Sequence, residues 1–253
     1  MTSKVALCFL TYDNLSQPSL WKGFINPKYN IYIHNKTSFK GIFAKYCIKN
    51  RVETKWGHMS LVHATLNLFK KAYETSDNEY FVLLSDKCIP LYTEEYIYNT
   101  INKWNNNIIL SYKMNPERFN TFQDKTFFDE DNFVKQHQWM VLNRTTVKFF
   151  IENDYTPIFG NTFNVPDEHY FINIMQKFSI PFTNKQVTYV NWEEDSDLQK
   201  YRKRPKTYSH LTNDMIENIK KSGCLFMRKV GPECTGLSIQ NPNIKSKIGM
   251  VVL

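Results

Sequence analysis

The chain of 253 residues carries 32 Lys and Arg against 24 Asp and Glu, so its net charge is +8 with His neutral. Hydrophobic residues make up 42% of the chain and aromatic residues 15%, which excludes an intrinsically disordered protein. With 8 Gly, 10 Pro and no run of about 18 apolar residues, the sequence also excludes a collagen-like architecture and predicts no membrane-spanning helix.

Cysteine usage and the N-terminal segment predict the cellular compartment. The five Cys are odd in number and share no Cys-x-x-Cys or metal-like spacing, so we expect neither a disulfide framework nor a zinc site. Residues 1–10 form too short an apolar segment for a signal peptide, and no small-residue cleavage site follows them. We therefore expect a cytoplasmic protein whose cysteines stay reduced.

The first half of the chain alternates predicted strands with predicted helices. Apolar runs predict strands at 4–10, 30–34 and 79–84, and helical periodicity predicts a helix that begins at Ser60 and another at 92–104. This alternation predicts an α/β fold with a mostly parallel central sheet flanked by helices. No linker or internal repeat divides the chain, so we expect a single domain over its whole length.

Polar residues follow each of these three predicted strands. Ligands of such sheets bind beyond the carboxyl ends of the strands, so Thr11, His34 and Asp86 become candidate ligand-binding residues. The chain contains neither a Gly-x-Gly-x-x-Gly motif nor a P-loop. A Rossmann dehydrogenase and a P-loop nucleoside triphosphatase are therefore not expected.

A helix that ends near Lys177 is predicted to present a carboxylate at its start. Asn164 is its expected N-cap, and Pro166 lies where a first helical turn tolerates it. Apolar residues then repeat at helical spacing, namely Phe171, Ile174, Met175 and Phe178. Glu168 thus falls on or beside the inward face, where its carboxylate can face a cleft. Alternatively, Asp167 and Glu168 only complement the helix dipole.

The last quarter of the chain concentrates the positive charge. The remaining predicted elements are strands at 107–112, 138–142 and 224–227, a helix at 144–153, and a helix that Thr212 caps. A basic run at 200–206 and the pair Arg228-Lys229 flank that last helix. These cations can form a compact phosphate-binding pocket or a solvated basic loop. Aromatic residues do not interleave with them along a groove, so we expect no nucleic-acid partner.

Five motifs in order carry a resemblance to a known family. They are Trp56-Gly-His-Met-Ser60, Tyr80-Phe-Val-Leu-Leu-Ser85-Asp86, Gln136-His-Gln138-Trp139, Pro166-Asp167-Glu168-His169 and Leu225-Phe-Met-Arg228-Lys229. From about residue 4 to 230 the chain resembles the core-2/I-branching β-1,6-N-acetylglucosaminyltransferases, with their plant and bacterial relatives and the peptide O-xylosyltransferases.

The resemblance implies a GT-A fold and an inverting, metal-independent glycosyltransferase. The donor is a UDP-sugar, with GlcNAc, xylose or a similar sugar transferred to a hydroxyl of a glycan or glycoprotein. The family's catalytic base falls on Glu168. Its two basic residues on the donor diphosphate fall on Lys229 and on Lys206, with Arg204 as the alternative to Lys206, and Arg228 stands beside them. Thr11, His34 and Asp86 are the further candidates for donor binding.

Acceptor binding and metal binding are the remaining site predictions. Gln138, Trp139 and Asp167 are the candidates for contacting the acceptor, while Trp56 and Trp139 fit a sugar-stacking face or a packed core. Metal-dependent GT-A enzymes carry Asp-x-Asp after the strand that precedes Ser85, where this chain has Asp86 and then Lys87. We therefore expect no divalent cofactor. The alternative function is a catalytically silent protein that binds nucleotide-sugars or carbohydrate.

Overall fold

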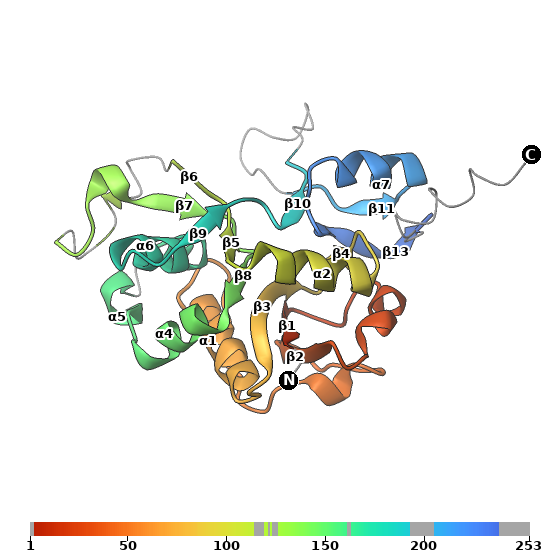
Figure 1. Cartoon of the computed structure of the whole chain (residues 1–253), viewed down its shortest axis with the longest axis horizontal. Helices are drawn as coiled ribbons and strands as arrows, with labels where there is room; N and C mark the ends of the chain where they lie inside the picture. Colours follow the sequence, from red (N-terminus) through yellow and green to blue (C-terminus); the bar gives the residue numbers. More distant parts are fainter. Residues whose placement is uncertain are drawn as a thin grey trace, which may run out of the picture. The chain divides into compact units, whose positions relative to one another are not determined.

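The structure is a computed structural model that describes residues 3–113, 119–120, 122, 126–160, 163–192 and 205–237. The chain forms two compact units (Figure 1). Unit 1 comprises Met1–Leu15, Ile25–Asp86 and Asn105–Val187, and unit 2 comprises Ser16–Phe24, Lys87–Trp104 and Thr188–Leu253. That all 253 residues act as a single catalytic domain stays a prediction.

Unit 1 is built on a six-stranded sheet in the order β2-β1-β3-β8-β5-β9. The strands are β1 (Lys4–Thr11), β2 (Tyr29–Asn35), β3 (Asn78–Ser85), β5 (Asn107–Ile109), β8 (Val141–Asn143) and β9 (Phe182–Asn184). The β1-β2, β1-β3 and β5-β9 pairs are parallel, and β8 runs antiparallel to both of its neighbours. This mixed, mostly parallel sheet confirms the predicted α/β class. Residues 5–9 are fully buried, as a continuous apolar run in a central strand requires.

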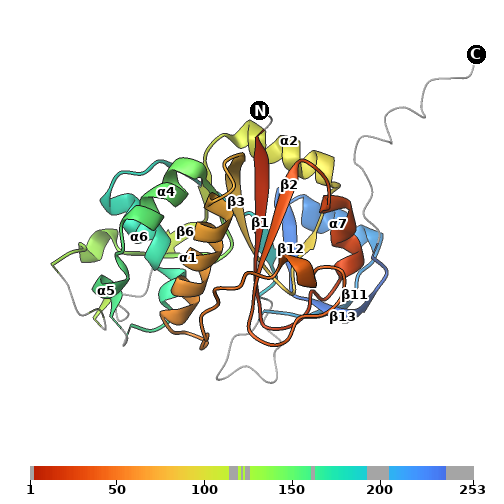
Figure 2. The ribbon, with the colours of Figure 1, turned by 90° about the horizontal axis from the view of Figure 1, so that it is seen from below.

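Helices cover this sheet, and a short hairpin extends unit 1 (Figure 2). The helices are α1 (Ser60–Tyr73), α4 (Arg144–Glu152), α5 (Thr156–Phe159) and α6 (Tyr170–Lys177), and the hairpin pairs β6 (Ser111–Lys113) with β7 (Val134–Gln136). Three 3-10 turns complete the unit, namely η2 (Ala44–Tyr46), η3 (Glu130–Asn132) and η4 (Pro166–Glu168). The predicted start of α1 at Ser60 is confirmed, and α1 packs against β1, β2, β3 and α4.

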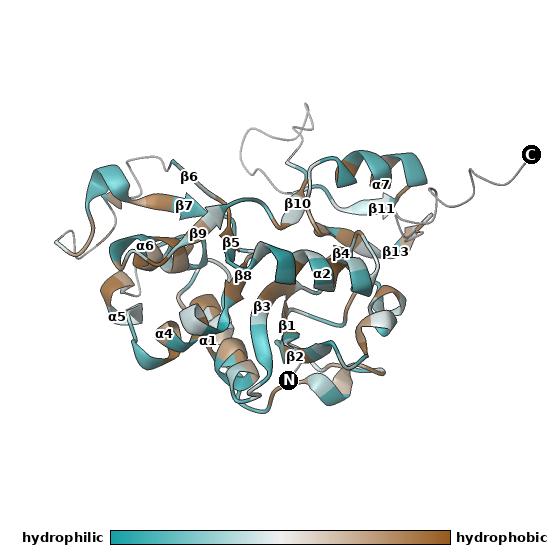
Figure 3. Cartoon of the chain, viewed as in Figure 1, coloured by the Kyte–Doolittle hydropathy of each residue, from teal (hydrophilic) through white to brown (hydrophobic). Residues whose placement is uncertain are grey.

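In its described residues, unit 2 combines two small sheets with two helices. One sheet joins β10 (Thr188–Val190), β12 (Phe226–Arg228) and β4 (Ile89–Pro90), and the other pairs β11 (Tyr208–His210) with β13 (Val230–Thr235). The helical segments are η1 (Pro18–Phe24), α2 (Glu94–Trp104) and α7 (Asn213–Lys220). Thr212 caps α7 as predicted, because its side chain accepts a hydrogen bond from the Met215 N–H. Most residues of α7 are hydrophilic, as the colouring of the ribbon in Figure 3 shows.

Two strand predictions in unit 1 need correction. The strand predicted at 107–112 is interrupted at Leu110. Before this residue β5 pairs within the main sheet, and after it β6 pairs with β7. The Leu110 carbonyl itself accepts a hydrogen bond from the His137 N–H. The strand predicted at 138–142 begins only at Val141, so Gln138 and Trp139 lie in the loop before β8 rather than at a strand start.

The helix predicted from Asn164 to Lys177 is two elements. Val165 takes a left-handed conformation with φ +52° and precedes the 3-10 turn η4. His169, at φ −140°, interrupts the helical path, and α6 begins at Tyr170. Asn164 therefore does not cap the helix. Phe178 closes α6 and is 41% exposed, so it lies outside the inward face that periodicity assigned to it.

No helix in the described part of the chain is both long enough and apolar enough to cross a membrane.

Candidate active site

The carboxyl ends of β1, β2 and β3 lie side by side, as the parallel sheet predicts. Leu10 pairs in register with both His34 and Ser85, and Thr11 pairs with Asn35. The Thr11 hydroxyl donates to the His34 carbonyl at 3.4 Å. The sheet therefore brings Thr11 and His34 to one edge, together with the end of β3 that precedes Asp86.

His34 is a structural link at that edge. Its side chain is fully buried, and Nε2 accepts a hydrogen bond from the Val52 N–H at 2.9 Å. Burial lowers the pKa of the imidazole, and the charge of Arg51 lowers it further. The neutral ring carries its proton on Nδ1, because Nε2 is the acceptor. His34 thus ties β2 to the segment that contains Arg51.

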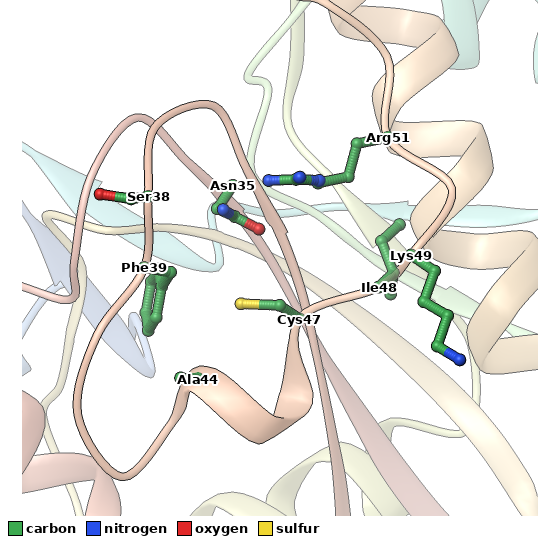
Figure 4. A pocket seen from close by; sticks show the side chains of 8 residues that line it. All are labelled: Asn35, Ser38, Phe39, Ala44, Cys47, Ile48, Lys49 and Arg51. Carbon is green, nitrogen blue, oxygen red and sulfur yellow. The ribbon is translucent and has the colours of Figure 1, made fainter.

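A pocket of about 490 Å³ opens beside the end of β2 (Figure 4). Its lining residues are Asn35, Ser38, Phe39, Ala44, Cys47, Ile48, Lys49 and Arg51. The Arg51 guanidinium points toward Asn35, and the Cys47 thiol points into the same space, whereas the Lys49 ammonium points away. This volume lies within the range of small-molecule sites.

Asn35 is a buried polar group that lines this pocket. It lies in the polar strand end that the sequence predicted as a site element, although only His34 of that segment was singled out as a binding residue. The residue is 4% exposed, and its Nδ2 donates to the Thr37 carbonyl at 2.6 Å. Among the residues that the structure describes, Oδ1 has no hydrogen-bond partner. An unpaired buried acceptor costs about 1–3 kcal/mol, which a ligand N–H can offset. The signal in the sequence was its position directly after His34, at the end of an alternating strand.

Glu168 stands on a turn whose backbone is tightly held. The Val165 N–H donates to the Gly57 carbonyl at 2.9 Å, and the Glu168 N–H donates to the Val165 carbonyl at 3.0 Å. The His169 side chain also contacts the Val165 carbonyl, at 3.1 Å through Nδ1. Gly57 has φ +73°, and a Cβ there would lie 3.2 Å from the Asn164 side chain, so a glycine is needed for this close approach.

The Glu168 carboxylate is partly exposed and forms an ion pair. Its side chain is 27% exposed, and Lys135 on β7 places Nζ 2.7 Å from Oε2. The neighbouring Asp167 is buried at 8% exposure. Burial above all, and then the charge of Glu168, raise the pKa of Asp167 to about 7, while Lys135 opposes that rise. The two adjacent carboxyl groups thus have different environments.

Asp167→Asn should remove a pH dependence of stability. Because the folded-state pKa of Asp167 is raised from 3.8 to about 7, its contribution to stability is full below pH 4 and is lost as the pH rises toward 7. Asn stays neutral at every pH, so its burial does not become unfavourable as the pH rises. Between pH 4 and pH 8 the free energy of unfolding of the variant should therefore rise by about 2–4 kcal/mol relative to that of the wild type. Urea unfolding of both proteins across this range measures the difference, and parallel pH curves would contradict it.

Lys206 and Lys229 lie next to each other in unit 2. The Lys229 N–H donates to the Lys206 carbonyl at 3.4 Å, and the Tyr208 N–H donates to the Lys229 carbonyl at 2.8 Å. The Lys206 ammonium lies 5.5 Å from the centre of the Tyr208 ring. Arg228 ends β12 directly before this pair, whereas Arg204 lies outside the described residues. The structure therefore places the backbones of Lys206 and Lys229 side by side, although the two residues are separated in sequence.

The candidate acceptor residues differ sharply in exposure. Trp139 is 4% exposed and Asp167 is likewise buried, so neither offers an open surface. Trp56 is 82% exposed, which excludes the core position that one interpretation of the sequence gave it. Gln138 lies in the loop before β8. A role in acceptor binding stays a prediction for Gln138, Trp139 and Asp167.

Within the described residues, no three His, Cys, Asp or Glu side chains form a group that could hold a metal ion. The sequence contains Asp-x-Asp at 129–131 and at 195–197. The first of these caps η3, because the Asp129 carboxylate accepts a hydrogen bond from the Asp131 N–H at 3.2 Å. The string at 195–197 lies outside the described residues. Metal independence is a prediction for experiment.

Comparisons with known proteins identify the family. The chain is 24% identical over 263 residues to Glycosyltransferase BC10 from Oryza sativa subsp. japonica, a match that covers 86% of this chain and 66% of the rice protein, slightly less than two thirds of its length. A solved structure of the bifunctional glycosyltransferase WbbM in its apo form is similar at a TM-score of 0.45 and 12% identity, over 90% of this chain and 46% of that one. Residues 5–220 match the family model described as Branch: Core-2/I-Branching enzyme. Since this model matches most of the chain, the protein belongs to the core-2/I-branching enzyme family.

Proposed function

We propose that the chain is an inverting, metal-independent glycosyltransferase. It moves a sugar such as GlcNAc or xylose from a UDP-sugar to a hydroxyl of a glycan or glycoprotein. The observation that carries this proposal is Glu168, a partly exposed carboxylate on a turn held by backbone hydrogen bonds. Membership of the core-2/I-branching family supports the reaction class.

In the proposed reaction, Glu168 accepts the proton of the acceptor hydroxyl while that oxygen attacks the anomeric carbon of the donor. The bond from the anomeric carbon to the diphosphate oxygen breaks, and its electron pair leaves with UDP. Attack from the face opposite the leaving group inverts the configuration of the transferred sugar. Lys206 and Lys229 supply the positive charge that stabilises the departing diphosphate.

The pocket at the end of β2 is the proposed place of the nucleoside part of the donor. It lies at the carboxyl edge of the parallel strands, where ligands of such folds bind. The buried Asn35 Oδ1 can accept a hydrogen bond from a base N–H, and the Arg51 guanidinium can donate to a carbonyl or hydroxyl oxygen. Thr11 and Asp86, at the ends of the neighbouring strands, are further candidates for this contact.

A thermal-shift screen of UDP-sugars in EDTA tests donor binding and metal independence together. A ligand at about 100 times its Kd adds about 2.7 kcal/mol, which corresponds to roughly 5–10 °C in Tm for a chain of this size. We expect UDP and its cognate sugar conjugate to give this shift without any divalent ion. Loss of the shift in EDTA, with recovery on adding Mn²⁺, would overturn metal independence.

Donor turnover separates the enzyme from a catalytically silent binding protein. An intact transferase slowly hydrolyses its UDP-sugar when water replaces the acceptor, and released UDP reports this. Binding of the donor with no release of UDP, either alone or with any glycan acceptor, would favour the silent protein.

A further inference from the structure

Lys135 is held in place by the elements on both sides of it. Its neighbour Gln136 is fully buried and accepts a hydrogen bond from the Ile172 N–H at 2.7 Å, in the first turn of α6. Its other neighbour, Val134, exchanges two 2.8 Å hydrogen bonds with the side chain of Asn173. Strand β7 is thus hydrogen-bonded to α6 at residues 134 and 136, so the backbone position of Lys135 between them is fixed.

The Lys135 side chain contacts an aromatic ring and a carboxylate. Tyr112, its partner in the β6-β7 register, places its ring centre 5.7 Å from Nζ. Nζ lies 2.7 Å from Glu168 Oε2, and its charge also acts on Asp167. At 24% exposure this ammonium is more shielded from water than a typical surface lysine.

We propose that Lys135 is a positioning residue for the catalytic base, holding one carboxylate oxygen of Glu168 in place through the 2.7 Å contact. This inference rests on the proposed role of Glu168. The proton moves from the acceptor hydroxyl to Glu168, and Lys135 keeps its own protons throughout.

The other titratable groups around Glu168 have different partners. His169, on the same turn, is buried and contacts the Val165 carbonyl. His63 lies on α1, which packs against η4, and its charge acts on Asp154. Lys135 makes a direct contact with the Glu168 carboxylate, whereas these two histidines have other partners.

Lys135→Met tests this role through its separate effects on the kcat and the KM of sugar transfer. At saturating donor we expect kcat to fall by roughly 10-fold or more, because Glu168 loses the contact that holds its carboxylate in place. The KM for the UDP-sugar should stay within a factor of two, since Lys135 has no proposed contact with the donor. Lys135→Arg should restore the rate.

Lys4→Met is the matched control. Lys4 and Asp77 form an ion pair in the same unit at 2.9 Å, with exposures of 26% and 25% that resemble the 24% and 27% of Lys135 and Glu168. Both variants should melt within a few degrees of each other, and Lys4→Met should keep the wild-type kcat. If Lys135→Met leaves kcat unchanged, or if Lys4→Met lowers it equally, the proposal is wrong.

The double variant separates this inference from the function on which it rests. In the Glu168→Gln background, Lys135→Met should cause no further loss of kcat, because the interaction is already absent. Full activity of Glu168→Gln alone would overturn the base assignment and this inference with it. An inactive Glu168→Gln combined with an additive loss from Lys135→Met would overturn this inference alone.

Discussion

Glu168→Gln should almost eliminate sugar transfer while it leaves the affinity for UDP within a factor of a few. Gln keeps the size of Glu and much of its hydrogen bonding but cannot accept the proton of the acceptor hydroxyl. Removal of a general base costs about 10²–10⁴-fold in rate. We propose that Lys206 and Lys229 bind the diphosphate, so the affinity for UDP should hardly change in this variant. Transfer assays and calorimetric titration with UDP measure the two quantities separately.

Asp167→Asn is the neighbouring control for this experiment. The same turn carries both residues, but Asp167 is buried, and its pKa of about 7 leaves it partly protonated near neutral pH. We expect a much smaller loss of activity than for Glu168→Gln. A fully active Glu168→Gln protein would refute the base assignment. A protein that neither transfers sugar nor binds UDP would show that Glu168 maintains the fold instead.

Lys229→Ala and Lys206→Ala should each weaken binding of UDP by about 10- to 150-fold, the equivalent of a charged hydrogen bond of about 1.5–3 kcal/mol. Uridine has no diphosphate, so its affinity should fall by less than about three-fold. The adjacent backbones of these residues, joined by the hydrogen bond from Lys229 N–H to the Lys206 carbonyl, support a shared ligand. Calorimetric titration of each variant with UDP and with uridine gives the comparison.

Lys221→Ala removes a charge from unit 2 without touching that pair. Lys221 follows α7 and donates to the Asn218 side chain at 2.8 Å on the surface. We expect wild-type affinity for both ligands. Equal losses for UDP and uridine in Lys206→Ala or Lys229→Ala would indicate a structural role. A loss in Arg204→Ala with none in Lys206→Ala would move the second diphosphate contact to Arg204.

The local sequence pattern was sufficient to predict those elements whose conformation depends on residues close together in the chain. The buried run at 5–9 defined β1, and the Thr212 cap with its following apolar residues defined α7, because strand burial and helix capping act within a few positions. Polar residues at the ends of two predicted parallel strands indicated that Thr11 and His34 lie at one edge of the sheet, because parallel strands align their carboxyl ends. The motif that contains Glu168 was likewise readable from sequence.

Contacts between distant segments were decided only by the tertiary structure. Periodicity could not reveal that Lys135 contacts Glu168 or that Val165 takes a left-handed conformation beside Gly57, because both depend on packing between segments that are distant in the chain. The two tryptophans show the same limit. Trp56 is open to solvent and Trp139 is buried, although both are large apolar residues beside polar neighbours, and burial depends on what the fold places over each ring.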